Sequence, residues 1–520
     1  MDGPAVDLGD PAAASPAITR AKERWILAAT IIASTMTFSD MTIVNVALPV
    51  LQRDLGASFA QVQWVVEAYT LVLSALILAG GAGGDLFGRR RVFSIGMAIF
   101  AAASAACGLA PTAGLLVAAR AAQGLGAALM MPGSLAIVSA SFPRARQGEA
   151  IGIWSATTGI SMTVAPAFGG WLIDTFSWHA AFLINLPLAA IAFAITQWKV
   201  PESRSGRPRR LDLGGMLLAT VGLGALTYGL IAAGEGGFGD PLAFGPMLLG
   251  ACALVLFVLQ EKRVQDPMVP LAFFRIPRFA VIQAFTFTLW AALQGTTFFV
   301  PFRLMQVQGF KPTEAGVALL PLVVTASILA RYFGRLTDRI QPRILLVSGA
   351  LFTGTGFFAL TLPDSGTSYV VGFLPALLLI GLGMGVCQVS VTVVALNAAG
   401  PANVGTSSAI NNMVARAGGL IAIAVFGLVL AHGYNAVLLP RLEAAGIPEA
   451  AQQAIALQRA KLAATIVPAD LSAAQQSAVA VIIKQSFVTG YRWAMTAAGV
   501  MALASALMAL RYLRRERKAP

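Results

Sequence analysis

Long apolar runs dominate the chain and limit the folds that it can adopt. A helix of about 20 apolar residues crosses the hydrocarbon core of a bilayer. Of the 520 residues, 57% are hydrophobic and only 11% are charged, whereas a soluble globular chain carries about 25% charged residues. We therefore expect an all-α integral membrane protein. The fourteen candidate spans lie at about 25–50, 62–83, 92–110, 113–139, 149–173, 179–198, 213–233, 243–260, 277–302, 313–333, 344–362, 370–396, 403–431 and 486–511.

The basic residues indicate how these spans are oriented. An even number of spans places both termini on the same side of the membrane. If that side is the cytoplasm, the inside segments hold 25 Lys and Arg residues and the short outside loops hold three. Cytoplasmic segments carry an excess of basic residues, so we expect cytoplasmic N- and C-termini. Because the net charge of +13 resides in these short segments, it does not predict binding to nucleic acid.

An internal repeat groups the spans into two blocks of six. Gly81 precedes Asp85 by four residues, and Gly334 precedes Asp338 by the same spacing, with arginines shortly after each aspartate. The two motifs both fall between the second and third spans of a six-span block only if 213–260 is an insertion. Parallel repeats of this kind are typical of two-bundle transporters. The predicted domains are a tail at 1–24, a bundle at 25–198, a basic linker at 199–212, an inserted pair at 213–260, a bundle at 277–511 with an outside loop at 432–485, and a tail at 512–520.

Asp40 lies inside the first apolar run. A carboxylate at that depth costs about 2.5–3.5 kcal/mol on insertion scales, which suggests a use for the charge. At helical spacing, Ser34, Thr37, Asp40 and Asn45 form one polar stripe,, and such stripes face a bundle interior or a water-filled cavity. We interpret Asp40 as a group that gains and loses a proton. A structural hydrogen bond between helices is the alternative.

Arg120 lies about two turns into the fourth run and cannot shed its charge, so it needs a carboxylate or carbonyl partner,. Asp40 and Glu67 are the only carboxylates well inside the expected spans. Contact with Arg120 would favour the ionised form of Asp40, and loss of that contact would favour the protonated form. A permanent ion pair is the alternative. Glu67 is either a second protonation site, a counter-charge for a cationic solute, or a group solvated at the outer rim.

The second half of the chain offers aromatic, amide and methionine side chains within its spans. Such side chains make an adaptable wall that suits hydrophobic solutes. We expect the substrate to contact these side chains together with the two buried carboxylates. The candidate substrate-binding residues are Asp40, Glu67, Trp290, Gln294, Phe298, Gln388, Asn412 and Met413.

Small residues and a proline in the fifth run predict tight helix packing and a kink. Glycines in the loop after the second run permit a tight turn, and its aspartate can cap the following helix or pair with an arginine. We expect both elements to gate the conformational change. The candidate gating residues are Gly81, Asp85, Gly88, Arg89, Arg90, Pro166, Gly169, Gly170 and Asp338.

Several of these stretches resemble one known family. Residues 81–91 resemble the loop signature of the major facilitator superfamily, and residues 120–126 (RAAQGLG) resemble its span-four motif. Residues 165–172 resemble its antiporter motif, with Ala165 in place of a glycine. Residues 40–49 (DMTIVNVALP), 64–69 and 182–187 are similar to the fourteen-span drug:proton antiporters of the EmrB/QacA type. His179-Ala180 and Ala417 depart from that pattern.

The resemblance implies a major facilitator fold of two six-helix bundles plus two inserted helices. It implies efflux of lipophilic, cationic or amphipathic drugs across the cytoplasmic membrane in exchange for protons, with no enzyme activity. A proton-coupled transporter of an endogenous metabolite and a non-transporting membrane sensor or scaffold are the alternatives. The sequence contains no GxxxxGK[ST] phosphate-binding loop,. We expect no cofactor or metal. The sequence leaves open whether an accessory protein contacts 432–485.

Overall fold

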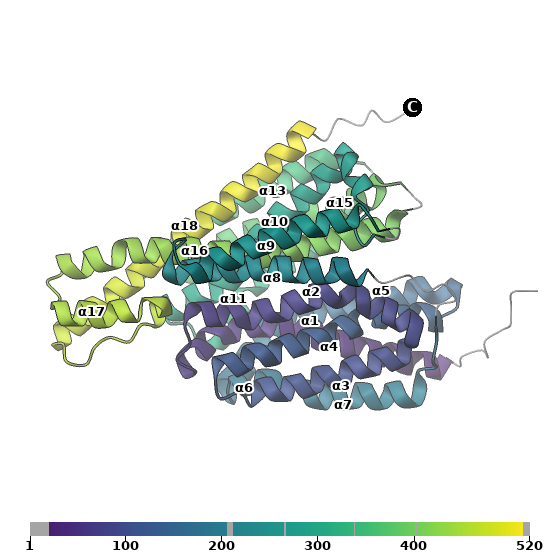
Figure 1. The fold of residues 1–520 in the computed structure, drawn as a ribbon, viewed down its shortest axis with the longest axis horizontal. Helices are drawn as coiled ribbons and strands as arrows, with labels where there is room; N and C mark the ends of the chain where they lie inside the picture. Colours follow the sequence, from purple (N-terminus) through teal and green to yellow (C-terminus); the bar gives the residue numbers. More distant parts are fainter. Residues whose placement is uncertain (1–19, 205–211, 265–266, 337–338, 401–402, 513–520) are drawn as a thin grey trace, which may run out of the picture.

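The computed structural model describes residues 20–204, 212–264, 267–336, 339–400 and 403–512, and within these ranges the regular structure is entirely helical (Figure 1). The predicted tail 1–24 and the linker and C-terminal tail thus lie mostly outside the described residues. The helices are α1 (Arg20–Asp54), α2 (Phe59–Phe87), α3 (Arg89–Gly108), α4 (Ala113–Ser141), α5 (Arg144–Thr175), α6 (Trp178–Leu183), α7 (Asn185–Lys199), α8 (Leu213–Gly236), α9 (Pro241–Glu261), η1 (Leu271–Arg275), α10 (Pro277–Phe302), η2 (Arg303–Val307), α11 (Pro312–Ala318), α12 (Leu320–Leu336), α13 (Pro342–Ala359), α14 (Tyr369–Gly372), α15 (Leu374–Ala398), α16 (Val404–Ala444), α17 (Glu449–Leu457), η4 (Arg459–Ala464) and α18 (Ala473–Tyr512).

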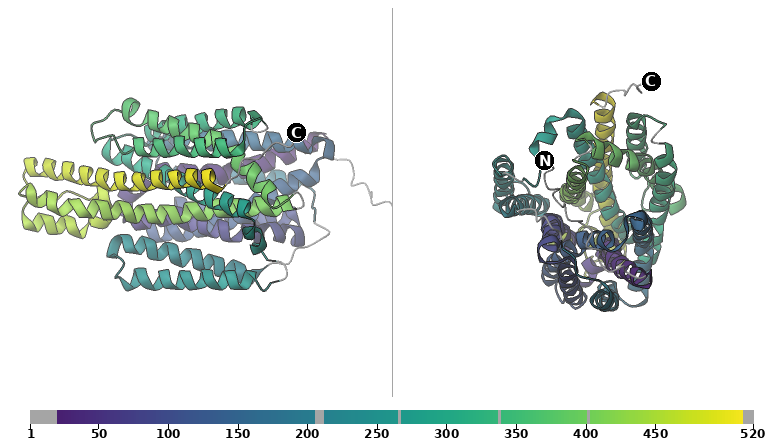
Figure 2. Two further views of the ribbon diagram at one scale, coloured as in Figure 1. Left: turned by 90° about the horizontal axis from the view of Figure 1, so that it is seen from above. Right: turned by 90° about the vertical axis from the view of Figure 1, so that its right-hand side faces the viewer.

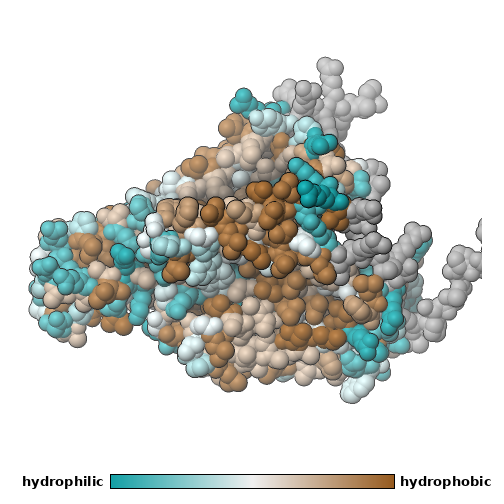
Figure 3. All heavy atoms as spheres, viewed as in Figure 1, coloured by the Kyte–Doolittle hydropathy of each residue, from teal (hydrophilic) through white to brown (hydrophobic). Residues whose placement is uncertain are grey.

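The helices form two bundles that lie side by side. Helices α1 to α7 pack together as one bundle, and α10 to α18 form the second. The pair α8–α9 lies beside both bundles, where α8 packs against α2 of the first and α16 of the second (Figure 2). Apolar side chains form a belt across the helices, and hydrophilic side chains gather at both ends (Figure 3). This distribution is the one that a bilayer-spanning protein requires.

Twelve helices among the described residues are long and apolar enough to cross a membrane, which is fewer than the fourteen spans expected from the sequence. The other two expected spans, 149–173 and 277–302, correspond to α5 and α10. Both helices are long, but α5 begins with Arg144, Arg146 and Glu149, and α10 carries two glutamines and four threonines. Polar residues within both helices leave neither with a stretch as apolar as that criterion requires.

Three expected spans contain a break that proline explains. The structure divides 179–198 between α6 and α7, 313–333 between α11 and α12, and 370–396 between α14 and α15. Pro187, Pro321 and Pro375 each follow the break by a few residues. Because proline lacks an N–H group, it cannot bond the carbonyl one turn earlier, and its ring crowds that carbonyl. Each pair still stacks as one span of 22 to 28 residues.

The expected outside loop 432–485, here called the cap, is largely helical. It consists of the last turns of α16, the short helices α17 and η4, and the first turns of α18. Its buried apolar side chains, among them Leu442, Ile455 and Leu462, continue the main apolar core of the molecule. The cap protrudes from one end of the molecule, which we call the capped end (Figure 1). Helix α1 begins and α18 ends at the opposite end, which we call the terminal end. Gln52 of α1 donates to the carbonyl of Lys461 at 3.0 Å, which ties the cap to the first bundle.

Glycines let α4 approach its neighbours closely and thereby fix the side chains between them. A Cβ atom at Gly124 would lie 2.6 Å from the carbonyl oxygen of Tyr69 in α2, and one at Gly126 would lie 2.6 Å from the backbone nitrogen of Phe100 in α3. Real Cβ atoms do not approach other atoms so closely. The two glycines therefore hold α2, α3 and α4 at the short separations that small residues permit. Arg120 and Gln123 lie on the same stretch of α4.

Candidate functional site

Asp40 and Arg120 form an ion pair in the middle of the first bundle. The Nη1 atom of Arg120 lies 2.5 Å from Oδ2 of Asp40. Gln123 donates to Oδ1 of Asp40 at 2.9 Å, and Asn185 donates to the same oxygen at 3.2 Å. Both amides also donate to the hydroxyl of Ser104, at 2.9 and 3.0 Å. Helices α1, α3, α4 and α7 therefore contribute one side chain or more each to a connected network.

Arg120 makes further contacts besides its pair with Asp40. Its Nε atom donates to the carbonyl of Val65 in α2 at 2.9 Å, and Nη1 donates to Gln123 at 2.6 Å. The guanidinium carbon lies 4.3 Å from the ring centroid of Tyr69, a distance at which cation–π attraction operates,. The Tyr69 hydroxyl in turn donates to the carbonyl of Thr37 at 3.4 Å. The arginine thus couples α2 to the network.

The pair is almost completely withdrawn from solvent: Asp40 is 1% exposed and Arg120 is 0% exposed. A buried ion pair of this kind persists only when further hydrogen bonds satisfy both ions. Each oxygen of Asp40 accepts at least one hydrogen bond, so the geometry holds the ionised carboxylate. Removing either ion would leave the other buried without a counter-charge, which costs about 3–5 kcal/mol.

Glu67 is fully buried, and neither of its carboxyl oxygens has a hydrogen-bond partner among the described residues. It is therefore not solvated at a rim in this conformation. The neighbouring polar side chain on α2, Gln63, does not bond Glu67, because it donates to the carbonyl of Ile423 in α16 at 2.8 Å. Burying an ionised carboxylate without a partner costs far more free energy than burying the neutral acid. Among the described residues, the Glu67 carboxyl group thus lacks the hydrogen bonds and the counter-charge that hold the Asp40 carboxylate.

A small cavity lies between the two bundles, beside the ion pair. Arg120, Tyr69 and Asn45 line one side of it, and Gln294 and Phe298 of α10 line the other. Met41, Val66, Thr70, Thr297, Gly419, Leu420 and Ile423 complete the wall. The cavity measures about 30 Å³, which is room for about one or two water molecules rather than for a drug. Water in this cavity would contact Arg120 directly.

The structure separates the other candidate substrate-binding residues from this cavity. Trp290 is half-buried against the main apolar core, and Met413 packs against a separate cluster with Phe279. Gln388 of α15 is exposed, and Asn412 is exposed with its amide donating to its own helix. Gln294 and Phe298 therefore share the cavity with Arg120, whereas Trp290, Gln388, Asn412 and Met413 do not.

The candidate gating residues of α5 lie where the two bundles touch at the capped end. A Cβ atom at Gly170 would lie 2.7 Å from Cα of Thr313 in α11, and one at Gly316 would lie 2.6 Å from the carbonyl carbon of Pro166. Asp174 accepts hydrogen bonds from both the backbone and the hydroxyl of Thr313. Gly169 abuts Ile43 of α1. Toward the terminal end, by contrast, Gly159 has open space around it.

The expected loop at 81–91 is instead a tight junction, because 81–87 belong to α2 and only Gly88 separates α2 from α3. Asp85 therefore does not cap α3, whose N-cap residue is Gly88. Contacts within the first bundle hold this junction. Asp85 accepts from Nε and Nη2 of Arg89 at 3.1 and 2.9 Å, and Gly88 has φ +107°, which favours glycine,. Glu202 accepts from the backbone of Arg90 at 3.0 Å and from that of Arg91 at 3.2 Å. Gly81 lies beside Pro132 of α4. Asp338, the equivalent aspartate of the second half, lies outside the described residues.

Sequence reasoning missed several members of the site. Ser104 is a common residue with no distinctive spacing, and the family-like stretches 64–69 and 182–187 contain Tyr69 and Asn185 without assigning them a role. Only the packing of α2, α3 and α7 against α1 shows what these residues contact. Arg416 of α16 lies close to Tyr69. Glu23 of α1 forms a bidentate pair with Arg146 of α5 at 2.6 and 2.7 Å. The position of Glu23 in the first turn of a helix did not indicate that Arg146 would be its partner.

The geometry predicts strong energetic coupling between Asp40 and Arg120. Asp40→Asn and Arg120→Gln should each lower the midpoint of thermal unfolding in detergent, because each leaves one buried charge alone. The neutral double variant should lose less stability than the sum of the two, with a coupling of about 0.5–3 kcal/mol. Thr163→Val on α5, whose hydroxyl bonds only its own helix at 2.8 Å, is the control and should add independently to Arg120→Gln. Additive losses for Asp40→Asn and Arg120→Gln would contradict the pairing.

Three relatives of known name cover most of the chain. The multidrug resistance protein Stp of Mycobacterium tuberculosis (strain CDC 1551 / Oshkosh) is 37% identical over 80% of this chain and 78% of its own length. The tetracenomycin C resistance and export protein of Streptomyces glaucescens is 33% identical over 91% of this chain and 89% of its own. The puromycin resistance protein pur8 of Streptomyces alboniger is 36% identical over 78% and 81%.

The fold is also found among solved structures. A bacterial homolog of the human lysosomal transporter Spinster, in an inward-facing and unoccupied conformation, superimposes with a TM-score of 0.66 over 96% of this chain and 100% of its own, at 18% identity. The peptide transporter POT in complex with sulfate superimposes with a TM-score of 0.64 over 96% of both chains, at 15% identity. The sequence profile of the Major Facilitator Superfamily matches residues 30–423. The chain is therefore a membrane transporter that belongs to the Major Facilitator Superfamily.

Proposed function

We propose that the protein exports lipophilic drugs across the cytoplasmic membrane and drives this export by the inward movement of protons. The observation that carries the proposal is the buried Asp40–Arg120 pair beside a cavity between the bundles. The relatives named for multidrug, tetracenomycin C and puromycin resistance support drug efflux. A scaffold would gain nothing from an ionisable pair at this depth.

Proton coupling needs a group whose protonation depends on the conformation, and Asp40 meets this requirement. In the present conformation Arg120, Gln123 and Asn185 all donate to it, which favours the carboxylate. We infer that a proton reaches Asp40 past Arg120, the member of the pair that lines the cavity. When the proton binds, the attraction to Arg120 is lost, and α1 becomes free to move relative to α4. Proton binding thereby changes which conformation is favoured.

Glu67 has a complementary part in this scheme. Because its carboxyl group is buried without a partner, we infer that it carries a proton in this conformation. Release of that proton would leave a negative charge that attracts a cationic or amphipathic drug. Met41, Phe298, Leu420 and Ile423 give the cavity an apolar wall, which suits the lipophilic part of such a drug. An enlarged form of the cavity, reached when the bundles move, would hold the substrate.

We also propose the fourteen-span arrangement of the EmrB/QacA-type antiporters. Helices α5 and α10 are 32 and 26 residues long and lie between the bundles' other helices, so both are long enough to cross the bilayer. The pair α8–α9 then supplies the two inserted spans. Both termini lie in the cytoplasm, and the cap lies outside, where it is free to meet an accessory protein.

The gate follows from the same arrangement. The close contact of α5 with α11, through Gly170 and Gly316, seals the outside while the bundles separate toward the cytoplasm. Pro166 and Gly169 allow α5 to bend and pack there. On the cytoplasmic side, Asp85 and the α2–α3 junction at 81–90 bias the opposite closure, together with the equivalent segment at Asp338.

Coupling through Asp40 is tested by flux in proteoliposomes that contain matched amounts of protein and a lipophilic cationic dye as substrate. Asp40→Asn should abolish uphill efflux driven by a pH gradient, because the amide cannot titrate in this range, while downhill dye exchange continues. Arg120→Ala should be as severe, and Glu67→Gln should be milder or selective for cationic substrates. Asp54→Asn, at the end of the same helix, is the control and should retain activity.

The same flux assay separates the rival functions. Counterflow of dye and protons supports antiport, co-flow indicates a metabolite symporter, and no flux of either indicates a sensor or scaffold. Full proton-driven efflux by Asp40→Asn would remove Asp40 from the coupling mechanism.

The outer closure is tested by Gly170→Val. The added side chain meets the backbone of α11, and overpacking of this kind costs about 1–3 kcal/mol. Because the cost falls only on the conformation that closes this end, efflux should fall by about tenfold, and a thiol reagent should reach the capped end more readily. Gly159→Val, on the same helix but in open space, is the matched control. Equal effects of the two substitutions would exclude Gly170 from the gate.

The proposed topology predicts opposite labelling of two positions. In a variant whose three native cysteines are replaced by serine, Leu457→Cys in the cap should react with an impermeant thiol reagent added to whole cells, since Leu457 is 88% exposed. Arg204→Cys, also exposed, should react only after the cells are opened. The reverse pattern would invert the topology.

A further inference from the structure

The inserted helix α8 carries a buried polar group without a partner, as does α2. Glu67 and Thr227 are both 0% exposed, and neither the Glu67 oxygens nor the Thr227 hydroxyl has a hydrogen-bond partner in the part of the chain that the structure describes. The great majority of buried side-chain polar atoms are hydrogen-bonded, so each exception calls for an explanation. Two exceptions at one place in the fold point to a shared role.

The Thr227 hydroxyl departs from what buried threonines do elsewhere in this protein. Thr196, Thr286 and Thr296 each donate to the carbonyl one turn earlier on their own helix, at 2.7 to 2.9 Å. That bond satisfies the hydroxyl without any partner from outside the helix. Thr227 makes no such bond, so its hydroxyl is directed away from its own backbone.

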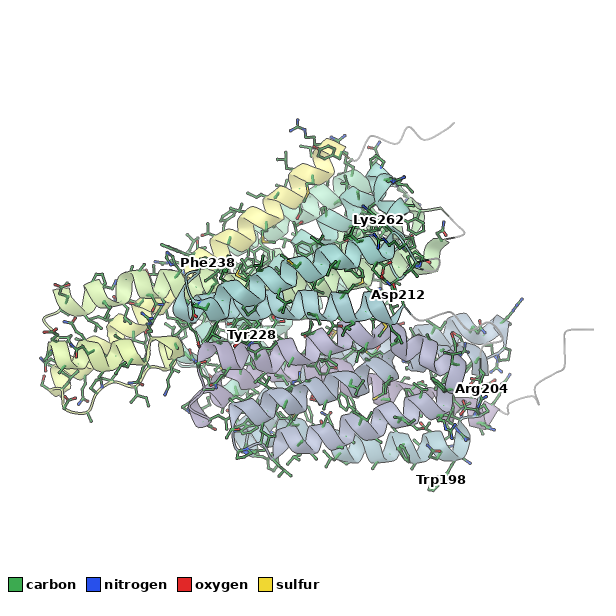
Figure 4. All side chains as sticks on the ribbon, viewed as in Figure 1. Trp198, Arg204, Asp212, Tyr228, Phe238 and Lys262 are labelled. Atoms are coloured by element: carbon green, nitrogen blue, oxygen red, sulfur yellow. The ribbon has the colours of Figure 1, made fainter. Side chains whose placement is uncertain are left out.

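Contacts on either side place Thr227 and Glu67 at the same level of two facing helices. The rings of Trp64 in α2 and Tyr228 in α8 lie 6.0 Å apart, and a Cβ atom at Gly224 would lie 2.9 Å from Leu71. Glu67 lies between Trp64 and Leu71 on α2, and Thr227 lies between Gly224 and Tyr228 on α8. Figure 4 shows Tyr228 on the side of α8 that faces α2.

Helix α16 of the second bundle closes the third side of this junction. Gln63, one turn before Glu67, donates to the carbonyl of Ile423 in α16. Gly234, two turns after Thr227, faces Leu428 and Ala431 of the same helix. At 100° per residue, Glu67 lies between the face of α2 that meets α8 and the face that meets α16. Thr227 lies between the face of α8 that meets α2 and the face that meets α16. Both side chains are therefore directed toward the point where α2, α8 and α16 meet.

The charged groups nearby do not pair with Glu67. Arg120 of α4 pairs with Asp40, Arg416 of α16 lies close to Tyr69, and Glu235 of α8 lies at the capped end beside Arg459. Among the described residues, none forms an ion pair with Glu67. The Thr227 hydroxyl is thus the polar group from α8 that shares the junction with this carboxyl.

We propose that α8 completes a protonation site at this junction, in which the Thr227 hydroxyl hydrogen-bonds the Glu67 carboxylate, directly or through one water molecule, after the proton leaves. Thr227 is then a positioning residue that sets the proton affinity of Glu67. Because α8 packs against both bundles, their relative movement changes its register against α2 and makes this bond depend on the conformation. The inference rests on the proposed role of Glu67 as a proton carrier, and it assigns a function to the inserted pair.

The test compares Thr227→Val, which keeps the shape but removes the hydroxyl, with Thr227→Ser, which keeps the hydroxyl. Proton-driven dye efflux is measured as a function of pH in proteoliposomes, with protein amounts and thermal stability matched. Thr227→Val should move the pH midpoint of efflux upward by about one unit, since a donor to the ionised carboxylate is lost. Thr227→Ser should restore the wild-type midpoint. Thr220→Val, on the same helix with its hydroxyl bonded to Met216, should leave the midpoint unchanged.

A second arm repeats Thr227→Val in the Glu67→Gln background. There the substitution should no longer move the midpoint, because the group that it acts on is gone. The proposal is overturned if Thr227→Val matches Thr220→Val, if its shift persists in the Glu67→Gln background, or if Glu67→Gln alone keeps the wild-type pH profile. Asp40→Asn, measured in the same vesicles, reports separately on proton coupling itself, so failure at Glu67 and failure of antiport are distinguishable.

Discussion

The structure depends on keeping one negative charge, that of Asp40, out of water. An uncompensated ion in this position would cost several kcal/mol, and side chains from α3, α4 and α7 stabilise it. Arg120 supplies the opposite charge, Gln123 and Asn185 supply amide donors, and Ser104 joins the two amides. Since these groups come from three helices besides α1, the charge on Asp40 helps to fix the packing of the first bundle. A change in that charge therefore acts on the whole bundle.

Glycine is what brings the helices near enough for this network to form. Gly124 and Gly126 remove the side chains that would separate α4 from α2 and α3, and Gly170 and Gly316 do the same between the bundles. The first pair acts within a bundle and has to persist in every conformation. The second pair acts across the boundary, so its contact has to break during transport. Identical residue chemistry thus serves both a permanent and a reversible contact.

Much of this arrangement follows from the sequence, and the remainder has identifiable physical reasons. The pairing of Asp40 with Arg120 was predictable because a buried arginine needs a counter-charge and few carboxylates are available. The roles of Asn185 and Ser104 were not, because they depend on which faces of α7 and α3 meet α1. Glu67 could not be assigned to core or rim, because helix periodicity does not say what covers a given face. The cap was expected as a loop because its helices continue α16 and α18 with polar, alanine-rich sequence, which lowers the hydropathy without ending the helix.

The continuity of α16 and α18 has a mechanical consequence. These helices contain 41 and 40 residues, so each is a rod about 60 Å long at 1.5 Å per residue. Rods that run unbroken from the second bundle into the cap act as lever arms, and a small tilt inside the membrane becomes a large displacement at the tip. The hydrogen bond from Gln52 to Lys461 holds that lever against the first bundle. A binder that clamps the cap from outside would therefore work with mechanical advantage over a movement that takes place in the membrane.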